Sequence, residues 1–194
     1  MDQLRLHCPW DREQTHRSLA TYLVEETYET LEAIESGDPD HLREELGDLL
    51  LQVFFHARIA DEMAEDDGGF SIDDVAAGIV DKLVHRHPHV FARTTETDAL
   101  SRDEVEANWE ALKGAEKGRA SVLDGVPMAL PALHLAGKVV GRAAKMSVAA
   151  EPDDSLGGRL LGLVVEARAT GEDPEQALRD AVRRLVEAVR AAEA

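Results

Sequence analysis

Two clusters of acidic residues, on what the helical periodicity predicts as consecutive helices, constrain this fold most. The first cluster holds Glu25, Glu26 and Glu29, and the second holds Glu45 and Asp48. At about 100° of turn per residue, the members of each cluster fall on one sector of their helix. Apolar residues share the second sector, so its carboxylates point partly toward the core. Carboxylates that converge there repel one another and lose hydration unless a cation compensates, so the pattern predicts a metal site.

The ligand chemistry of this site indicates a hard divalent cation. Oxygen-only ligands favour Mg²⁺, Mn²⁺ or Ca²⁺ over zinc. The alternative is that these are solvated charges on helix surfaces, the usual state of Glu in a chain with 31% charged residues. Either cluster alone favours this alternative, because the ExxE spacing often arises by chance. Their order on adjacent helices favours the metal site.

Helix-start and helix-stop signals predict an all-α fold without convincing strand alternation. Gly37 and Pro39 separate the first two helices, which are therefore expected to be antiparallel, and Asp40 is expected to cap the second. Capping boxes are predicted at Ser71 and Ser101. The predicted helices span about residues 13–36, 41–64, 71–85, 101–117, 132–145, 156–169 and 174–192.

Composition excludes several classes of function. A net charge of −18 argues against nucleic acid held on a basic surface. No apolar run is long enough to span a membrane, and no signal-peptide pattern opens the sequence, so we expect a soluble cytoplasmic protein without a membrane partner. Cys8 is the only cysteine, which excludes an internal disulfide and a cysteine metal cluster.

Several motifs together resemble the MazG family of nucleoside triphosphate pyrophosphohydrolases. Its signature, EExxE followed by ExxD, is matched by the two acidic clusters, and the segments Cys8–Asp11, Lys82–Leu83 and Arg86–Phe91 are also similar. The resemblance covers about residues 1–117 and implies a catalytic domain over 1–118. It implies a MazG-like four-helix bundle completed by homodimerisation, with extra C-terminal helices. It also implies Mg²⁺, with Mn²⁺ as the alternative, for hydrolysis of (d)NTP to (d)NMP and pyrophosphate in nucleotide-pool cleaning.

The resemblance also implies roles for individual residues. Glu26, Glu29, Glu45 and Asp48 correspond to metal ligands, and Glu25 to a further ligand or a group that orients the attacking water.

Five residues are candidates for substrate binding. Lys82 and Arg86 share a helix face and resemble the family's phosphate-contacting residues, although a solvated cationic stripe explains them equally well. Trp10 could stack on a base, but anchoring of the N-terminal segment is the favoured interpretation. Lys113 and Lys117 could reach phosphate, with a solvated face as the default.

Residues 119–194 resemble the beginning of the second domain of longer family members. Where its EExxE and ExxD motifs would be expected, the chain has Val148–Glu151 and Leu156–Arg159 instead. We therefore predict a shortened, degenerate unit that serves packing or dimer formation.

Other classes of protein fit the sequence less well. A ferritin-like di-iron protein needs paired Glu-x-x-His elements, and only Glu13 and His16 have that spacing. Alternating His85, His87 and His89 could chelate a transition metal, but a structural segment of the family explains them better. A non-catalytic acidic helical adaptor or regulatory protein derived from the enzyme remains the alternative. An adaptor would have no need of the metal-binding carboxylates, so the intact carboxylates of the first unit speak against this alternative.

Overall fold

The computed structural model of this chain describes residues 1–92, 101, 104–105, 108–109, 112 and 121–193, and every regular element in these ranges is helical. The predicted all-α class is therefore confirmed. The chain divides into two compact units, residues 1–110 and 111–194. The boundary expected after residue 118 falls outside the described residues. The first unit contains α1 (Asp2–His7), α2 (Pro9–Glu13), α3 (His16–Ser36), α4 (Pro39–Ala60), the 3₁₀ turn η1 (Glu65–Asp67), α5 (Ile72–Arg86) and α6 (Pro88–Phe91).

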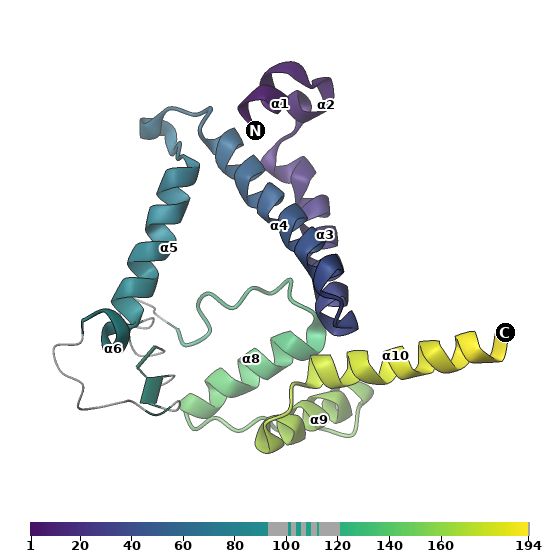
Figure 1. Ribbon diagram of the computed structural model, residues 1–194. Coiled ribbons are helices and arrows are strands. Elements are labelled where there is room, and N and C mark those ends of the chain that lie inside the picture. The colour runs from purple at the N-terminus through teal and green to yellow at the C-terminus, as the bar shows by residue number, and fades with distance from the viewer. Residues whose placement is uncertain (93–100, 102–103, 106–107, 110–111, 113–120, 194) are drawn as a thin grey trace. The chain divides into compact units, whose positions relative to one another are not determined.

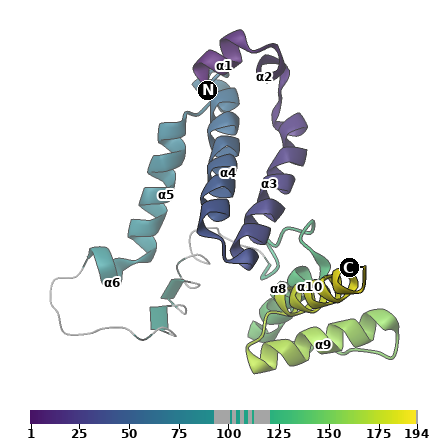
Figure 2. The ribbon, with the colours of Figure 1, turned by 45° about the vertical axis from the view of Figure 1, so that its right-hand side comes forward.

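Helices α3 and α4 form an antiparallel hairpin, as the sequence predicts (Figures 1 and 2). Thr15 caps α3 through a capping box, and Gly37 ends it in the left-handed region at φ 70°. The expectation that Asp40 caps α4 is wrong. Asp38 is the N-cap, and its carboxylate accepts a hydrogen bond from the Asp40 backbone N–H at 2.9 Å. Because Pro39 suits the first helical position, α4 begins two residues earlier than expected.

The N-terminal helices α1 and α2, which the periodicity did not predict, are tied to the end of α4 by Arg5. This side chain is 9% exposed, and its guanidinium binds the Glu62 carboxylate through Nε at 2.8 Å and Nη2 at 2.5 Å. This hydrogen bond stabilises the charged form of both side chains. It raises the pKa of Arg5 and lowers the pKa of Glu62. Nη1 also donates to the carbonyls of Asp11, Arg12 and Gln14.

The core of the first unit is thin. Its buried apolar residues, within the part of the chain described, are Leu19, Ala33, Phe55, Ala57 and Ala60. A second apolar sector of α4 is open, because four of its large side chains are between 40% and 54% exposed. They are Leu46, Leu50, Val53 and Phe54. The α3–α4 hairpin thus buries one sector of α4 and leaves another uncovered.

Helix α5 begins at the predicted capping box, in which Ser71 Oγ accepts from the Asp74 N–H and the Asp74 carboxylate accepts from the Ser71 N–H. Its large apolar side chains are exposed as well, including Val75, Ile79, Val80, Leu83 and Val84. The predicted box of Ser101 and Glu104 forms too. The rest of the helix expected over 101–117 lies partly outside the described residues.

The second unit contains α8 (Ala132–Lys145), α9 (Leu156–Thr170) and α10 (Pro174–Glu193), within one residue of the predicted bounds. Val164 of α9 is fully buried, and Gly137 of α8 is buried. Gly171, at φ 79°, ends α9, and Asp173 then caps α10 by accepting from the backbone N–H groups of its first turn. None of the described helices has the length and apolar character needed to cross a membrane.

Candidate metal centre

The α3–α4 hairpin brings together three of the predicted metal ligands. Glu26 and Glu29 on α3 and Glu45 on α4 each offer a carboxylate oxygen, and these oxygens lie within 4.8 Å of one another. Glu26 and Glu45 are half-buried, whereas Glu29 is exposed. Glu26 and Glu45 are far apart in the sequence, but they converge because the short turn after α3 places α4 antiparallel to α3.

Thr30 fixes the two helices against each other at this point. Its side chain is 7% exposed, and Oγ1 donates to the Glu26 carbonyl at 2.7 Å and lies 3.5 Å from the Glu45 carbonyl. Thr30 is thus a small buried spacer between the main chains that carry two of the carboxylates. Thr30 was not identified from the sequence, although its spacing of four residues from Glu26 on the same helix allows its hydroxyl to bond the Glu26 carbonyl.

The electrostatics of the cluster disfavour the charged state of Glu26. Burial is the largest cause that raises the pKa of Glu26, followed by the negative charges of Asp48, Glu29 and Glu45 and a side-chain hydrogen bond with Glu29. The charge of Asp48 thus acts on Glu26, although Asp48 is not among the three carboxylates whose oxygens converge. A cation placed among them would oppose these effects, because its positive charge favours the ionised form of every carboxylate around it.

The donor set fits a hard divalent cation. Several oxygen ligands from carboxylates, with open sides for water, suit Mg²⁺ or Mn²⁺. His41 lies beside this set, because its Nε2 is 3.2 Å from Glu45 Oε1. Sequence analysis missed this partner, although the i, i+4 spacing of His41 and Glu45 on one helix would have identified it.

Glu25 lies next to Glu26 on α3, and its side chain is exposed. It is not among the three carboxylates whose oxygens converge. Its role as a further ligand or as the group that orients water stays a prediction.

The predicted phosphate-binding residues lie on another helix. Lys82 is exposed on α5, and Arg86, at the end of the same helix, is 5% exposed with its guanidinium carbon 5.1 Å from the centre of the Trp109 ring. The His87 ring also lies against Trp109, at 4.8 Å between centroids. Lys82 and Arg86 thus belong to α5, whereas the converging carboxylates belong to α3 and α4. Trp109 is a further candidate for the substrate site that was not singled out from the sequence.

Trp10 contacts two aromatic rings edge to face, Tyr22 at 5.7 Å and Phe55 at 6.4 Å between centroids. These contacts agree with anchoring of the N-terminal segment. Since 49% of Trp10 is exposed, stacking on a base stays open as a prediction. Lys113 and Lys117 lie outside the described residues.

Comparison with known proteins places this site in a family. Residues 14–91 match the MazG nucleotide pyrophosphohydrolase domain, and this range contains all the converging carboxylates. A protein of Thermotoga maritima named nucleoside triphosphate pyrophosphohydrolase/pyrophosphatase MazG is 37% identical over 206 residues, which cover 93% of this chain and 76% of that protein. The chain belongs to the MazG family. The resemblance drawn from the sequence motifs is thus confirmed.

Other MazG relatives align with the whole chain. An uncharacterized 26.1 kDa protein of Streptomyces cacaoi is 51% identical, and the alignment covers 100% of this chain and 79% of that protein. The nucleoside triphosphate pyrophosphohydrolase of Mycobacterium tuberculosis is 47% identical over 100% of this chain and 56% of its own length. This chain therefore spans just over half of the mycobacterial relative.

Proposed function

We propose that this MazG protein is a divalent-metal-dependent nucleoside triphosphate pyrophosphohydrolase that releases nucleoside monophosphate and pyrophosphate. The observation that carries the proposal is the convergence of Glu26, Glu29 and Glu45 at one point of the α3–α4 hairpin. The relatives named for this enzyme class support it. Mg²⁺ is the proposed metal and Mn²⁺ the alternative, because both accept carboxylate ligands readily.

In the proposed mechanism, Glu26, Glu29, Glu45 and Asp48 hold the metal. When bound, the metal offsets charge on the triphosphate and makes the attacking water more acidic. Glu25 would accept the proton of that water as its oxygen bonds to one of the two phosphorus atoms, and the P–O bond that bridges the α and β phosphorus atoms breaks to release nucleoside monophosphate and pyrophosphate.

Two cationic side chains complete the proposed substrate site. Lys82 and Arg86 bind the phosphate oxygens, and stacking on Trp109 keeps the Arg86 guanidinium in one orientation. No protein nucleophile is required, because water is the attacking group.

We also propose that the enzyme is a homodimer with the nucleotide near the subunit interface. The open apolar sector of α4 and the exposed apolar side chains of α5 support this, because two such faces can complete a bundle that one chain leaves thin. We further propose a role in nucleotide-pool cleaning in the cytoplasm.

The experiment that tests the metal ligands compares Asp48→Ala with Glu44→Ala. Glu44 precedes a proposed ligand on α4, but its side chain is exposed and lies outside the converging group. We expect Asp48→Ala to lose metal-dependent pyrophosphate release while retaining its helical circular dichroism, and Glu44→Ala to keep full activity. Activity that persists in Asp48→Ala would contradict this ligand assignment.

A further inference from the structure

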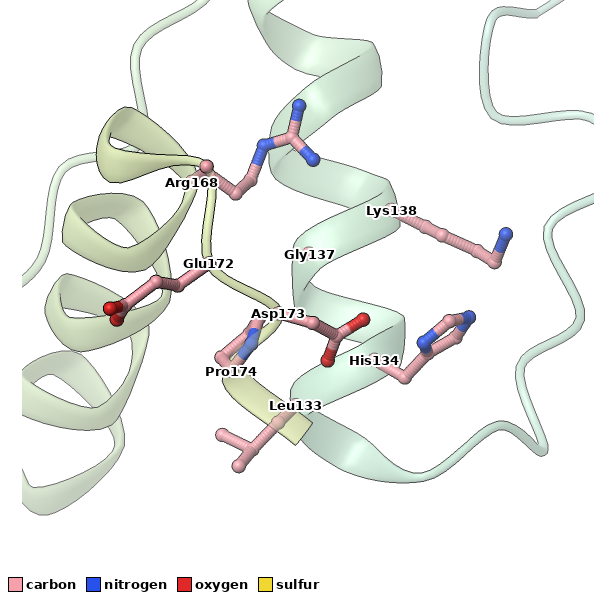
Figure 3. A pocket seen from close by; sticks show the side chains of 9 residues that line it. Leu133, His134, Gly137, Lys138, Arg168, Glu172, Asp173 and Pro174 are labelled. Atoms are coloured by element: carbon pink, nitrogen blue, oxygen red, sulfur yellow. The ribbon is translucent and has the colours of Figure 1, made fainter. Parts of the chain in front are cut away.

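A cavity of about 360 Å³ lies in the second unit, between α8 and the turn that joins α9 to α10 (Figure 3). His134 and Lys138 reach it from successive turns of α8, and Arg168 reaches it from the last turn of α9. Three basic side chains from two helices thus border one cavity in a region without the family's acidic motifs.

The charges at this cavity are unusual for the chain as a whole. The protein has 39 acidic and 21 basic residues, and Arg5, Arg43 and Arg58 each form an ion pair with a carboxylate. Lys138 and Arg168 have no ion pair with any residue in the described part of the chain. In so acidic a protein, two cations without an ion pair at one cavity are unusual and are available to an anionic ligand.

Arg168 is held in place by the shape of α8. Its guanidinium lies over Gly141, where an added Cβ would come within 2.7 Å of Nη2 and 2.8 Å of Cζ. The absence of a side chain at this position therefore allows the planar group to lie against the helix. Lys138 is three residues earlier on α8 and shares this face.

Two carboxylates, those of Glu172 and Asp173, also border the cavity. Asp173 Oδ1 accepts hydrogen bonds from the N–H groups of Glu175 at 2.9 Å and Gln176 at 3.0 Å, so it is engaged as the cap of α10. Figure 3 shows the Glu172 side chain directed away from Lys138 and His134. Asp173 thus shares the cavity with the basic side chains, but one of its oxygens is engaged at the α10 cap, and Glu172 is directed away from Lys138 and His134.

We propose that this cavity is a second anion site, which binds a phosphoryl group through Arg168 and Lys138. A guanidinium presents paired donors to phosphate oxygens, an ammonium adds a point charge, and His134 supplies a third donor. The volume suits inorganic pyrophosphate or a nucleoside monophosphate. The site is separate from the carboxylate cluster and needs no metal, so it does not depend on the proposed catalytic activity.

Calorimetric titration of the full chain with inorganic pyrophosphate, in the presence of chelator, tests this site. We expect one site per chain, and binding about tenfold weaker or more in Arg168→Ala and in Lys138→Ala, since each removes hydrogen bonds to a charged group. Arg159→Ala removes an exposed cation elsewhere on α9 and should bind as the wild type does. Absence of binding in chelator, or equal loss in Arg159→Ala, would overturn the proposal. So would loss in Lys82→Ala with full binding in Lys138→Ala, because the anion would then lie on α5.

The Gly141→Ala variant tests whether anion binding depends on the position of the Arg168 guanidinium or only on the number of basic residues. It keeps every basic residue but displaces the guanidinium of Arg168, so we expect weaker pyrophosphate binding together with an equal or higher melting temperature, because Ala favours a helix over Gly. Unchanged binding in this variant would contradict the assigned geometry.

Titrations with nucleoside monophosphate and with succinate, compared with pyrophosphate, show which class of anion the cavity prefers. Tighter binding of the monophosphate identifies a nucleotide as its source, and tighter binding of pyrophosphate identifies the inorganic anion. Equal binding of succinate would refute a phosphoryl site.

Discussion

Replacement of Glu26 by Gln removes one charge from the carboxylate cluster and keeps the size of the side chain. In the metal-free protein, Glu26 lies with Glu29 and Glu45 in a group whose oxygens are within 4.8 Å, and burial together with neighbouring charges disfavours its ionised form. The neutral amide relieves this repulsion. We therefore expect metal-free Glu26→Gln to be more stable than the wild type and to lose the stabilisation that Mg²⁺ provides.

The expected gain follows from Coulomb's law. Two unit charges 4.8 Å apart repel by about 0.9 kcal/mol in water and about 3.5 kcal/mol at an effective dielectric constant of 20. Because Glu29 is exposed, the water-like value applies, and salt reduces it further. The loss of two such pairs should raise the free energy of unfolding by about 1 kcal/mol, or the melting temperature by about 2–4 °C.

Thermal unfolding with chelator and with rising Mg²⁺ measures both effects. At a Mg²⁺ concentration about 100 times the dissociation constant, the wild type should gain about 2.7 kcal/mol and the variant much less. Glu32→Gln, which changes an exposed residue on α3 outside the cluster, is the matched control and should behave as the wild type does. A metal-free Glu26→Gln protein less stable than the wild type, or one that Mg²⁺ stabilises equally, would refute the electrostatic argument.

Three further predictions concern pH, the N-terminal anchor and assembly. Because the pKa of Glu26 is raised above 4.5, its ionisation lowers the free energy of unfolding as the pH rises from 4.5 through the folded-state pKa. Mg²⁺ must displace the same proton, so the thermal stabilisation that Mg²⁺ provides should shrink as the pH falls toward 4.5. A Mg²⁺-induced rise in melting temperature that does not depend on pH would exclude Glu26 as a ligand. Arg5→Met removes the hydrogen bonds to Glu62 and to three backbone carbonyls and leaves Glu62 only its longer pair with Arg58, so it should lower the free energy of unfolding in urea by about 2–3 kcal/mol. Arg43→Met, which breaks an exposed pair, should cost less than about 1 kcal/mol, and an equal loss would contradict the anchor. Leu50→Glu places a charge on the open sector of α4 and should yield monomers in light scattering; an intact dimer would show that this sector is not the interface.

The sequence predicted the larger helices well, because their limits depend on local chemistry. Gly37, Ser71 and Gly171 act through their own backbone or side-chain hydrogen bonds, so their effects can be read without the fold. Helices α1 and α2 were not predictable in this way. They have six and five residues, too few for periodicity, and the long-range bonds of Arg5 hold them.

The same distinction applies to the candidate site. The convergence of Glu26 and Glu45 was predictable, because one short turn forces the two helices side by side. The contact between Arg86 and Trp109 depends on tertiary structure and could not be read from spacing. Periodicity also identified the apolar residues of α4, but it could not show that Phe55 is buried while Phe54 remains exposed.

The central claim is most directly tested by pyrophosphate release from a panel of ribo- and deoxyribonucleoside triphosphates, with Mg²⁺, with Mn²⁺ and with chelator. Glu45→Ala is the control, because it removes the α4 member of the converging group. We expect release that requires metal and is lost in the variant. Release that persists in chelator or in Glu45→Ala would contradict the metal centre, and an inactive wild type across the panel would contradict the proposed activity.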